Sequence, residues 1–306
     1  MWGEEGGVRT PEEPLAGGMA GVAGLGGAGH RALRARDGRG CARVGVGGAA
    51  RADPEQPEGL ARVARGLAGR ALPVCFFAYN PARYERFLAG VRAEAEADRG
   101  GVYLASGCCD RGCGGVSARV AQADGALGGG GFLDAFYAEY VCPGGDFDAA
   151  AGALEAIREH QVAGRVGFVG ASTHSASVAR ALLDSERHAP HLDLLMLRYN
   201  MSHDVHEANG TLEAAQARGV AVVAFTSTRW NGLCDTSKPG SPTAADCVSW
   251  ALSGADAVLH SPRNERELRA VWEGTRAMAP AEVERWRAYG RAWAAEARDG
   301  FEDDAA

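Results

Sequence analysis

Residues 166–197 read VGFVGASTHSASVARALLDSERHAPHLDLLML. An apolar run (Val166–Gly170) is followed by a stretch with helical spacing of its apolar residues (175–187) and then by a second apolar run (Leu192–Leu197). Strands that alternate with helices of this length are typical of βαβ units, in which consecutive strands run parallel. Ser175 is a favourable N-cap residue, so the helix is predicted to begin there.

The same alternation extends in both directions along the chain. The further predicted strands are Ala42–Gly47, Val74–Ala78, Val102–Ser106, Phe132–Ala138, Val220–Phe225 and Ala257–His260. The further predicted helices lie near 57–68, 82–97, 115–127, 148–162, 210–218, 242–253 and 265–275, with one more over 280–298. Eight strands, each followed by a helix, predict a single closed (β/α)8 TIM barrel. The alternative is a doubly wound open sheet, whose glycine fingerprint is matched only in part by Gly45, Gly47 and Gly48.

Local signals mark several helix ends. Asp146 is predicted to cap the helix near 148–162. Gly164 and Gly219 lie where the end of a helix favours a left-handed residue. The last predicted helix carries aromatic residues on one face: Trp286, Tyr289 and Trp293.

Composition limits the classes of function. The chain has 306 residues, of which 46% are apolar and 23% are charged, and its formal net charge is −7. Acidic residues and arginines are interleaved, so no basic stripe is available for nucleic acid or for an anionic membrane. No apolar run approaches the roughly 20 residues of a membrane-spanning helix. The 8 cysteines do not predict a disulfide framework in a chain of this length, which favours a reducing compartment.

Three regions are expected along the chain. Residues 1–40 are rich in glycine, alanine and proline without a sustained period, and they are predicted to form a disordered head. Residues 41–298 are assigned to the barrel and 299–306 to a short acidic tail. The acidic start lacks the features of a secretory signal, so a cytoplasmic location is expected. Arginines within the head leave an organelle transit peptide as the alternative.

The chemistry of a TIM barrel gathers in the loops that follow the C-terminal ends of its strands. Glu139 follows the fourth predicted strand, where a carboxyl in apolar surroundings has a raised pKa and can act as an acid. Tyr79 and Tyr84 follow the second strand, where a tyrosine can donate a proton if a cation lowers its pKa. The simpler interpretations are an ion pair between Glu139 and an arginine, and tyrosine rings that only pack.

Three cysteines, Cys108, Cys109 and Cys113, follow the third predicted strand. Their proximity is compatible with a metal or redox site. Adjacent cysteines are, however, poor ligands for tetrahedral zinc, and no second pair of cysteines or histidines lies nearby. Ordinary loop cysteines are the favoured interpretation, and no metal site is predicted.

Residues suited to a dinucleotide follow the fifth, seventh and eighth predicted strands. Ser172, Thr173 and His174 precede a helix, a position that suits hydrogen bonding to an amide or a phosphate. Residues 225–232 (FTSTRWNG) combine aromatic rings, hydroxyls and an arginine, and 260–265 (HSPRNE) open another helix. Rings stack on flat heterocycles, and hydroxyls and arginines bind phosphate. These loops predict a cleft for a diphosphate and a stacked ring, with a merely polar barrel rim as the alternative.

Four stretches resemble, in order and spacing, the aldo-keto reductase superfamily, in a divergent bacterial and algal branch. They are GRVGFVGASTH (164–174), LMLRYN (195–200), VVAFTSTRWNG (222–232) and PTAAD (242–246). The resemblance covers about residues 42–290 and is weaker in the N-terminal third. It implies a TIM barrel that binds NADP(H) across the strand ends and transfers hydride between the nicotinamide and a small carbonyl or alcohol.

The resemblance also implies which residues bind the cofactor. Ser172 and Thr173 are assigned to the nicotinamide carboxamide, and Phe225 to stacking on the ring. The other assignments are Thr226, Thr228 and Arg229 for the pyrophosphate, and Ser261, Arg263 and Asn264 for the 2′-phosphate end.

The catalytic residues of the family are matched poorly. Ala78 replaces the family's Asp, and Gly107 replaces its Lys. Tyr84 matches the family's Tyr with a one-residue slip, and Glu139 takes the His position. Without the Lys, no obvious cation lowers the pKa of Tyr84, and Arg111 is the nearest candidate.

Two functions follow from the sequence. The leading one is an NADP(H)-dependent oxidoreductase that acts on a small-molecule carbonyl, with Tyr84 and Glu139 sharing the acid role. The alternative is a catalytically inactive barrel that retains nucleotide binding as a sensor or partner-binding module, because the usual Asp and Lys are lost. A metal or thiol-based role for the three loop cysteines is a third hypothesis.

Overall fold

The strands close into a barrel in the computed structural model, which describes residues 30–48, 58–78 and 84–296. All pairings are parallel and follow chain order, and the eighth strand pairs with the first. The strands are β1 (Val44–Gly48), β2 (Val74–Ala78), β3 (Val102–Cys108), β4 (Leu133–Ala138), β5 (Val166–Thr173), β6 (Leu194–Arg198), β7 (Ala221–Phe225) and β8 (Ala257–His260). The predicted TIM barrel is therefore confirmed, and the open doubly wound sheet is wrong.

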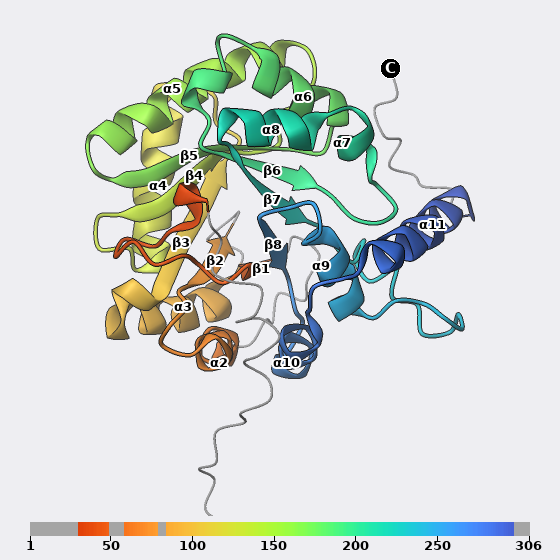
Figure 1. Ribbon diagram of the computed structural model, residues 1–306. Helices are drawn as coiled ribbons and strands as arrows, with labels where there is room; N and C mark the ends of the chain where they lie inside the picture. Colours follow the sequence, from red (N-terminus) through yellow and green to blue (C-terminus); the bar gives the residue numbers. More distant parts are fainter. Residues whose placement is uncertain (1–29, 49–57, 79–83, 297–306) are drawn as a thin grey trace, which may run out of the picture.

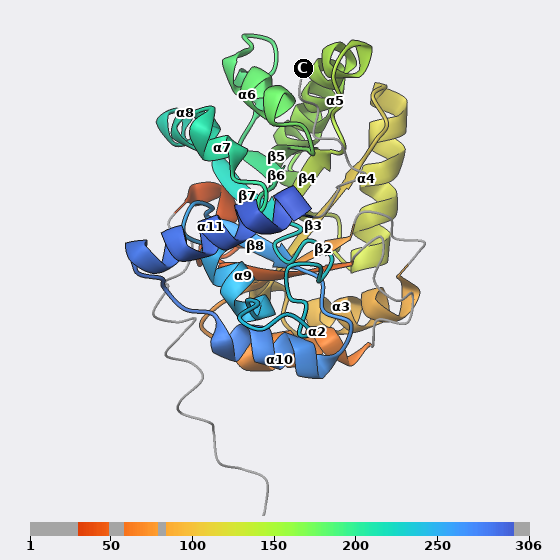
Figure 2. The same cartoon turned by 90° about the vertical axis from the view of Figure 1, so that its right-hand side faces the viewer.

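Helices surround the barrel on all sides, as the two views in Figure 1 and Figure 2 show. They are α2 (Gly59–Ala68), α3 (Glu85–Ala97), α4 (Cys113–Leu127), α5 (Gly145–Val162), α6 (Ala176–Asp184), α7 (Val205–Ala208), α8 (Thr211–Arg218), α9 (Ala244–Ala251), α10 (Glu265–Gly274) and α11 (Pro280–Glu296). Short 3-10 turns are η1 (Arg31–Leu33), η3 (Arg99–Gly101) and η4 (Ala189–His191).

The predicted strands and helices are all present, with small shifts at their ends. The hydroxyl of Ser175 caps α6 by accepting a hydrogen bond from the backbone N–H of Val178 at 3.3 Å, as expected. The predicted cap of α5 is wrong, because Gly144 is the N-cap and Asp146 lies inside the first turn. The short helix α7 was not predicted, since four residues carry too little apolar periodicity to be recognised.

The structure describes the segment before β1 from residue 30, within the part of the chain that the sequence assigns to the head. A bridge pairs Arg34 with Gly40, and the Tyr103 hydroxyl donates a hydrogen bond to the carbonyl of Ala32 at 2.7 Å. Ala32 and Leu33 are buried against the barrel interior, and this burial explains the order of a segment that has no strong local pattern. The rest of the predicted head and the acidic tail lie outside the described residues.

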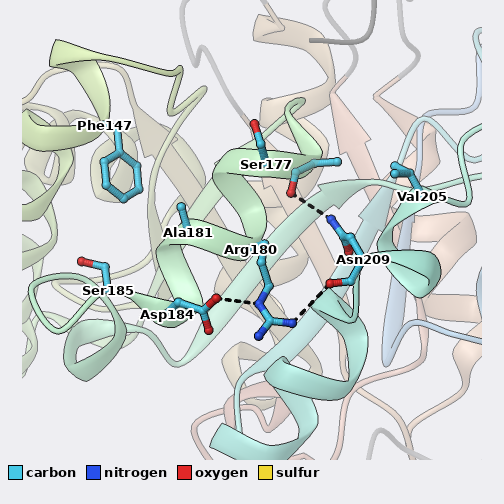
Figure 3. A pocket seen from close by; sticks show the side chains of 9 residues that line it. Phe147, Ser177, Arg180, Ala181, Asp184, Ser185, Val205 and Asn209 are labelled. Carbon is cyan, nitrogen blue, oxygen red and sulfur yellow. Dashed lines mark hydrogen bonds and ion pairs between the residues drawn. The ribbon is translucent and has the colours of Figure 1, made fainter. Parts of the chain in front are cut away.

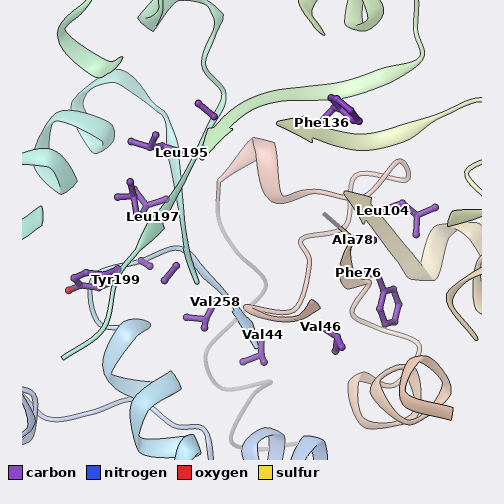
Figure 4. Close-up of a cluster of buried hydrophobic side chains, with 14 of the residues drawn as sticks. Val44, Val46, Phe76, Ala78, Leu104, Phe136, Leu195, Leu197, Tyr199 and Val258 are labelled. Carbon is purple, nitrogen blue, oxygen red and sulfur yellow. The ribbon is translucent and has the colours of Figure 1, made fainter. Parts of the chain in front are cut away.

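Side chains alternate between two cores, because successive strand residues point to opposite faces of a sheet. The larger core lies between strands and helices, and Figure 4 shows part of it around Val46, Phe76 and Leu104. The smaller core fills the barrel interior and includes Phe77, Tyr103, Tyr137, Met196 and Val223. This alternation fixes which residue at each strand end can reach the mouth of the barrel.

Candidate active site

The residues that line the mouth of the barrel are the interior-facing residues at the C-terminal ends of the strands, beyond the packed interior core. Interior residues occupy every second position of β3, β4, β5 and β7. Continuing that alternation to the C-terminal strand ends gives the residues that face the mouth: Gly107, Glu139, Ser172 and Phe225.

Glu139 is the acidic residue of this set. Its side chain is almost fully buried, at 3% exposure, and its Oε2 accepts a hydrogen bond from the Ser172 hydroxyl at 2.7 Å. Its Oε1 has no hydrogen-bond partner within the described part of the chain. Burial raises the pKa of Glu139 to about 7, although the Ser172 hydrogen bond and the charge of Arg111 act in the opposite direction. A carboxyl with this pKa can donate or accept a proton near neutral pH.

Gly107 provides the space in which the Glu139 carboxyl lies. A Cβ atom at Gly107 would come within 2.5 Å of Glu139 Cγ and 2.6 Å of Oε1. Any longer side chain on β3, including a lysine, would therefore collide with Glu139 where it now lies. The absence of a side chain at Gly107 and the position of the Glu139 carboxyl are therefore sterically linked.

Arg111 is held beside Glu139 without pairing to its carboxyl. One guanidinium nitrogen donates to the main-chain carbonyl of Glu139 at 2.7 Å, and Nε donates to Asp146 Oδ1 at 2.9 Å. Arg111 is therefore ion-paired with the Asp146 carboxylate, while its charge still lowers the pKa of Glu139. Arg111 is committed where it is, rather than being free to serve as the missing cation beside Tyr84.

Tyr84 lies at the start of α3 and is almost completely buried. Its ring is 3.1 Å from the position that a Cβ atom on Gly48, the last residue of β1, would take. Tyr84 also interacts electrostatically with Tyr140, which directly follows Glu139. Tyr84 and Ala78 both belong to the outer core between strands and helices, where Figure 4 shows Ala78, and Tyr79 lies outside the described residues.

Three aromatic rings connect the loops after β4, β5 and β7. The rings of Tyr140 and His174 stack at 5.1 Å with an interplanar angle of 9°, and His174 meets Phe225 edge-on at 4.9 Å. Burial, followed by the positive charge of Arg198, lowers the pKa of His174 to about 4, so its imidazole is neutral at pH 7. Its Nε2 is buried and has no hydrogen-bond partner among the described residues. The three loops therefore converge at one end of the barrel.

The two neighbouring hydroxyl residues on β5 have different surroundings. Ser172 faces the mouth, and its Oγ accepts from the backbone N–H of Tyr140 at 3.0 Å while donating to Glu139. Thr173 faces the helical layer and donates to the carbonyl of Val141 at 2.7 Å. Ser172 is thus part of the acidic site, whereas Thr173 holds the loop after β4. Their contact with a carboxamide remains a prediction.

The loop after β7 has an unusual backbone. Thr226, Arg229, Trp230 and Asn231 all have positive φ angles, between 52° and 67°, which non-glycine residues adopt at a cost. The Arg229 guanidinium lies over the Trp230 ring, 4.5 Å from its centroid, and the Thr228 hydroxyl accepts from the N–H of Asn231 at 3.3 Å. The Thr226 hydroxyl is buried and has no hydrogen-bond partner among the residues described. Such strain is concentrated at functional sites.

Side chains from two other elements hold this loop in place. Trp293 of α11 donates from Nε1 to the carbonyl of Gly232 at 3.1 Å, and the hydroxyl of Tyr289 donates to the next carbonyl at 3.3 Å. Asn200, after β6, donates to the carbonyl of Thr226 at 3.0 Å. The aromatic face of the last helix was predicted, but the role of Asn200 was not, because a single loop asparagine carries no sequence signal.

The residues predicted to bind the 2′-phosphate have different partners in the structure. The Ser261 hydroxyl lies 3.1 Å from the position of a Cβ atom on Gly47, above the barrel interior. Arg263 binds Glu267, with Nε 2.7 Å from Oε1. Asn264 caps α10 by accepting from the N–H of Glu267 at 2.9 Å. Glu267, which the sequence analysis did not single out, is the residue that contacts both.

The loop cysteines do not form a metal site in the described structure. Burial raises the pKa of Cys108 to about 11, whereas Cys113 is exposed and its thiol donates to Glu159 at 3.9 Å. Across residues 30–48, 58–78 and 84–296, no three His, Cys, Asp or Glu side chains are grouped closely enough to hold a metal ion.

A surface groove lies outside the barrel, between α5, α6 and α7 (Figure 3). Phe147 and Val205 line it, together with the ion pair between Arg180 and Asp184 at 2.7 Å. None of the predicted site residues lines this groove. No helix in the described part of the chain is both long and apolar enough to cross a bilayer.

Comparisons with known proteins show the fold. No protein-family model matches the chain, and no curated protein matches it by sequence. Among solved structures, an aldo/keto reductase from Klebsiella pneumoniae in complex with NADP and acetate is similar, with a TM-score of 0.67 and 12% identity over 86% of this chain and 96% of that one. The apo form of Gox0644 has a TM-score of 0.64 and 14% identity over 81% of this chain and 89% of that one. The chain therefore shares the barrel fold of an aldo/keto reductase.

Proposed function

We propose that this protein is an oxidoreductase of the aldo-keto reductase type, which transfers hydride between a nicotinamide dinucleotide and a small carbonyl or alcohol. The observation that carries the proposal is the buried Glu139 carboxyl at the barrel mouth, with a pKa of about 7 and one oxygen available. The shared fold with an NADP-bound aldo/keto reductase supports it. NADP(H) is the cofactor that the sequence resemblance implies.

The described residues fit a nicotinamide ligand. Buried polar atoms of His174 and Thr226 lack hydrogen-bond partners in the described chain, and a ligand amide offers both donors and acceptors. The partly exposed ring of Phe225 lies beside His174 and provides an apolar face for a flat heterocycle. The resemblance assigns Arg229, which lies over the Trp230 ring, to the diphosphate.

Glu139 supplies the proton for carbonyl reduction. A bound reduced nicotinamide supplies the hydride for the carbonyl carbon. The protonated Glu139 carboxyl donates its proton to the carbonyl oxygen, and the hydroxyl of Ser172 then stabilises the resulting carboxylate through the existing 2.7 Å hydrogen bond. In the oxidative direction the Glu139 carboxylate accepts the proton of the alcohol.

Tyr84 is assigned a share in binding the substrate oxygen. In support, Tyr84 is buried in the outer core beside the end of β1 and interacts electrostatically with Tyr140, which directly follows Glu139. Arg111 is bound to Asp146. Because the pKa of Glu139 is about 7, we assign the proton transfer mainly to Glu139 and the orientation of the substrate oxygen to Tyr84.

The experiment measures dinucleotide binding by fluorescence and then turnover on a panel of small aldehydes and ketones. We expect binding with turnover, and a kcat for reduction that falls above a pH of about 7 as Glu139 loses its proton. Glu139→Gln should lower kcat by roughly 10²–10⁴-fold while leaving the dinucleotide Kd unchanged. Ser172→Ala should move the pH limb upward, because the Ser172 hydrogen bond lowers the pKa of Glu139.

Tyr84→Phe is the companion variant. We expect it to raise KM for the carbonyl more than it lowers kcat, with the pH limb unchanged. Dinucleotide binding by the wild type without turnover of any carbonyl would refute the catalytic role of Glu139 and favour a binding module.

A further inference from the structure

Glu267 contacts two of the residues that the resemblance assigns to the cofactor 2′-phosphate, Arg263 and Asn264. Its Oε1 accepts from Arg263 Nε at 2.7 Å and from a second guanidinium nitrogen of the same residue. Its Oε2 accepts the backbone N–H of Arg263 at 2.7 Å. The Glu267 carboxylate thus accepts hydrogen bonds from the guanidinium and the backbone N–H of Arg263, the donors with which this loop would bind an anion.

Two further contacts hold the carboxylate in the first turn of α10. The side chain of Asn264 accepts the Glu267 N–H at 2.9 Å and so fixes the start of the helix. Buried His260, whose Nε2 has no hydrogen-bond partner in the described chain, interacts electrostatically with Glu267. Partial burial opposes ionisation, but the hydrogen bonds from Arg263 outweigh it and lower the pKa of Glu267. Glu267 therefore carries a full negative charge at neutral pH.

A phosphate dianion and a ribose diol respond differently to this charge. The 2′-phosphate of NADP(H) would have to displace Glu267 from Arg263, yet the carboxylate would remain nearby, because it is attached to the same helical turn. The 2′-hydroxyl of NAD(H) is neutral and can donate a hydrogen bond to a carboxylate. Like-charge contact at a binding site is a common source of specificity.

We propose that Glu267 makes this protein prefer NAD(H) to NADP(H), an inference that rests on the proposed function of the barrel mouth. The Arg263–Glu267 pair is exposed on the arginine side, so its own strength is modest. The preference for NAD(H) does not depend on the strength of this ion pair. The negative charge of Glu267 repels a 2′-phosphate whether or not Glu267 is paired with Arg263.

The test measures Kd values of NADH and NADPH by the fluorescence of the reduced nicotinamide, without any substrate. The wild type should bind NADH about tenfold more tightly than NADPH. Glu267→Gln should tighten NADPH binding by about tenfold and leave the NADH Kd within roughly twofold. Glu265→Gln is the matched control, because it removes the same charge from the same helical turn at a residue that does not bind Arg263. Adding Arg263→Ala to the Glu267→Gln variant should abolish the gain in NADPH affinity.

Tighter binding of NADPH than of NADH by the wild type would overturn the proposal, as would an unchanged NADPH Kd in the Glu267→Gln variant. An equal gain in the Glu265→Gln variant would also overturn it, since the effect would then come from net charge alone. Binding of neither dinucleotide would refute the proposed function itself, and this inference with it, and is distinguished from the other outcomes by the absence of any fluorescence change.

Discussion

Replacing Glu139 with glutamine should change how stability depends on pH, even without any ligand. In the folded protein the pKa of Glu139 rises from 4.5 to about 7 because the carboxyl is buried. The folded state therefore holds a proton on Glu139 between these two pH values, while the unfolded state has lost it. Stability falls with rising pH wherever the folded state binds more protons.

The size of this effect follows from the shift. Since one pKa unit corresponds to 1.36 kcal/mol, a rise from 4.5 to about 7 costs the wild type about 3 kcal/mol of unfolding free energy by pH 8. Glutamine has nearly the same shape, carries no charge at any pH and can still accept the Ser172 hydrogen bond. The difference in unfolding free energy between variant and wild type should therefore move by about 3 kcal/mol in favour of the variant from pH 4.5 to pH 8.

Urea unfolding of both proteins at a series of pH values measures this difference directly. Groups that titrate equally in both proteins cancel, so the change with pH isolates Glu139. Glu96→Gln, at an exposed position on α3, is the control for loss of a surface carboxyl. A difference between wild type and Glu139→Gln that stays constant from pH 4.5 to 8 would refute the raised pKa, and with it the assignment of Glu139 as a proton donor at neutral pH.

Three further changes test the surroundings of the site. Gly107→Ala places a Cβ atom 2.5 Å from Glu139 Cγ and should destabilise the fold by about 1–3 kcal/mol, measured by urea unfolding. Asn200→Ala removes the 3.0 Å hydrogen bond to the carbonyl of Thr226, so limited proteolysis should cut the loop after β7 faster than in wild type. Trp293→Phe keeps an aromatic ring but loses the 3.1 Å hydrogen bond to that loop, and thermal unfolding should show a loss of about 1 kcal/mol.

The barrel was predictable because its signal is repeated. Each apolar run and each helical stretch is weak evidence alone, but eight such pairs in order favour a closed barrel over an open sheet. The place of Glu139 was predictable for the same reason, since the strand period sets which residue past the core faces the mouth. The exact ends of strands were not predictable. Strand β5 extends to Thr173, beyond its predicted end, because polar residues there continue the hydrogen bonding between strands without an apolar pattern in the sequence.

The electrostatic details required the structure. Sequence spacing places Arg263 and Glu267 four residues apart, a spacing that favours an ion pair on a helix, yet it also fits two side chains that each face solvent. Only the structure shows that the Glu267 carboxylate also accepts a hydrogen bond from the backbone N–H of Arg263. In the same way, Arg111 was a candidate cation until its guanidinium was found bound to Asp146.

The loop after β7 shows why local sequence rules fail at the candidate site. Residues with positive φ are normally signalled by glycine, but here Arg229, Trp230 and Asn231 adopt that conformation in succession. Each such residue costs on the order of 1–3 kcal/mol, so contacts elsewhere must offset the strain. Trp293 of α11 supplies one of them through its hydrogen bond to this loop. Because that helix follows the eighth βα unit, its position is not needed to close the barrel, and its contacts with the loop give it a function: it holds a strained segment at the mouth where the diphosphate is proposed to bind.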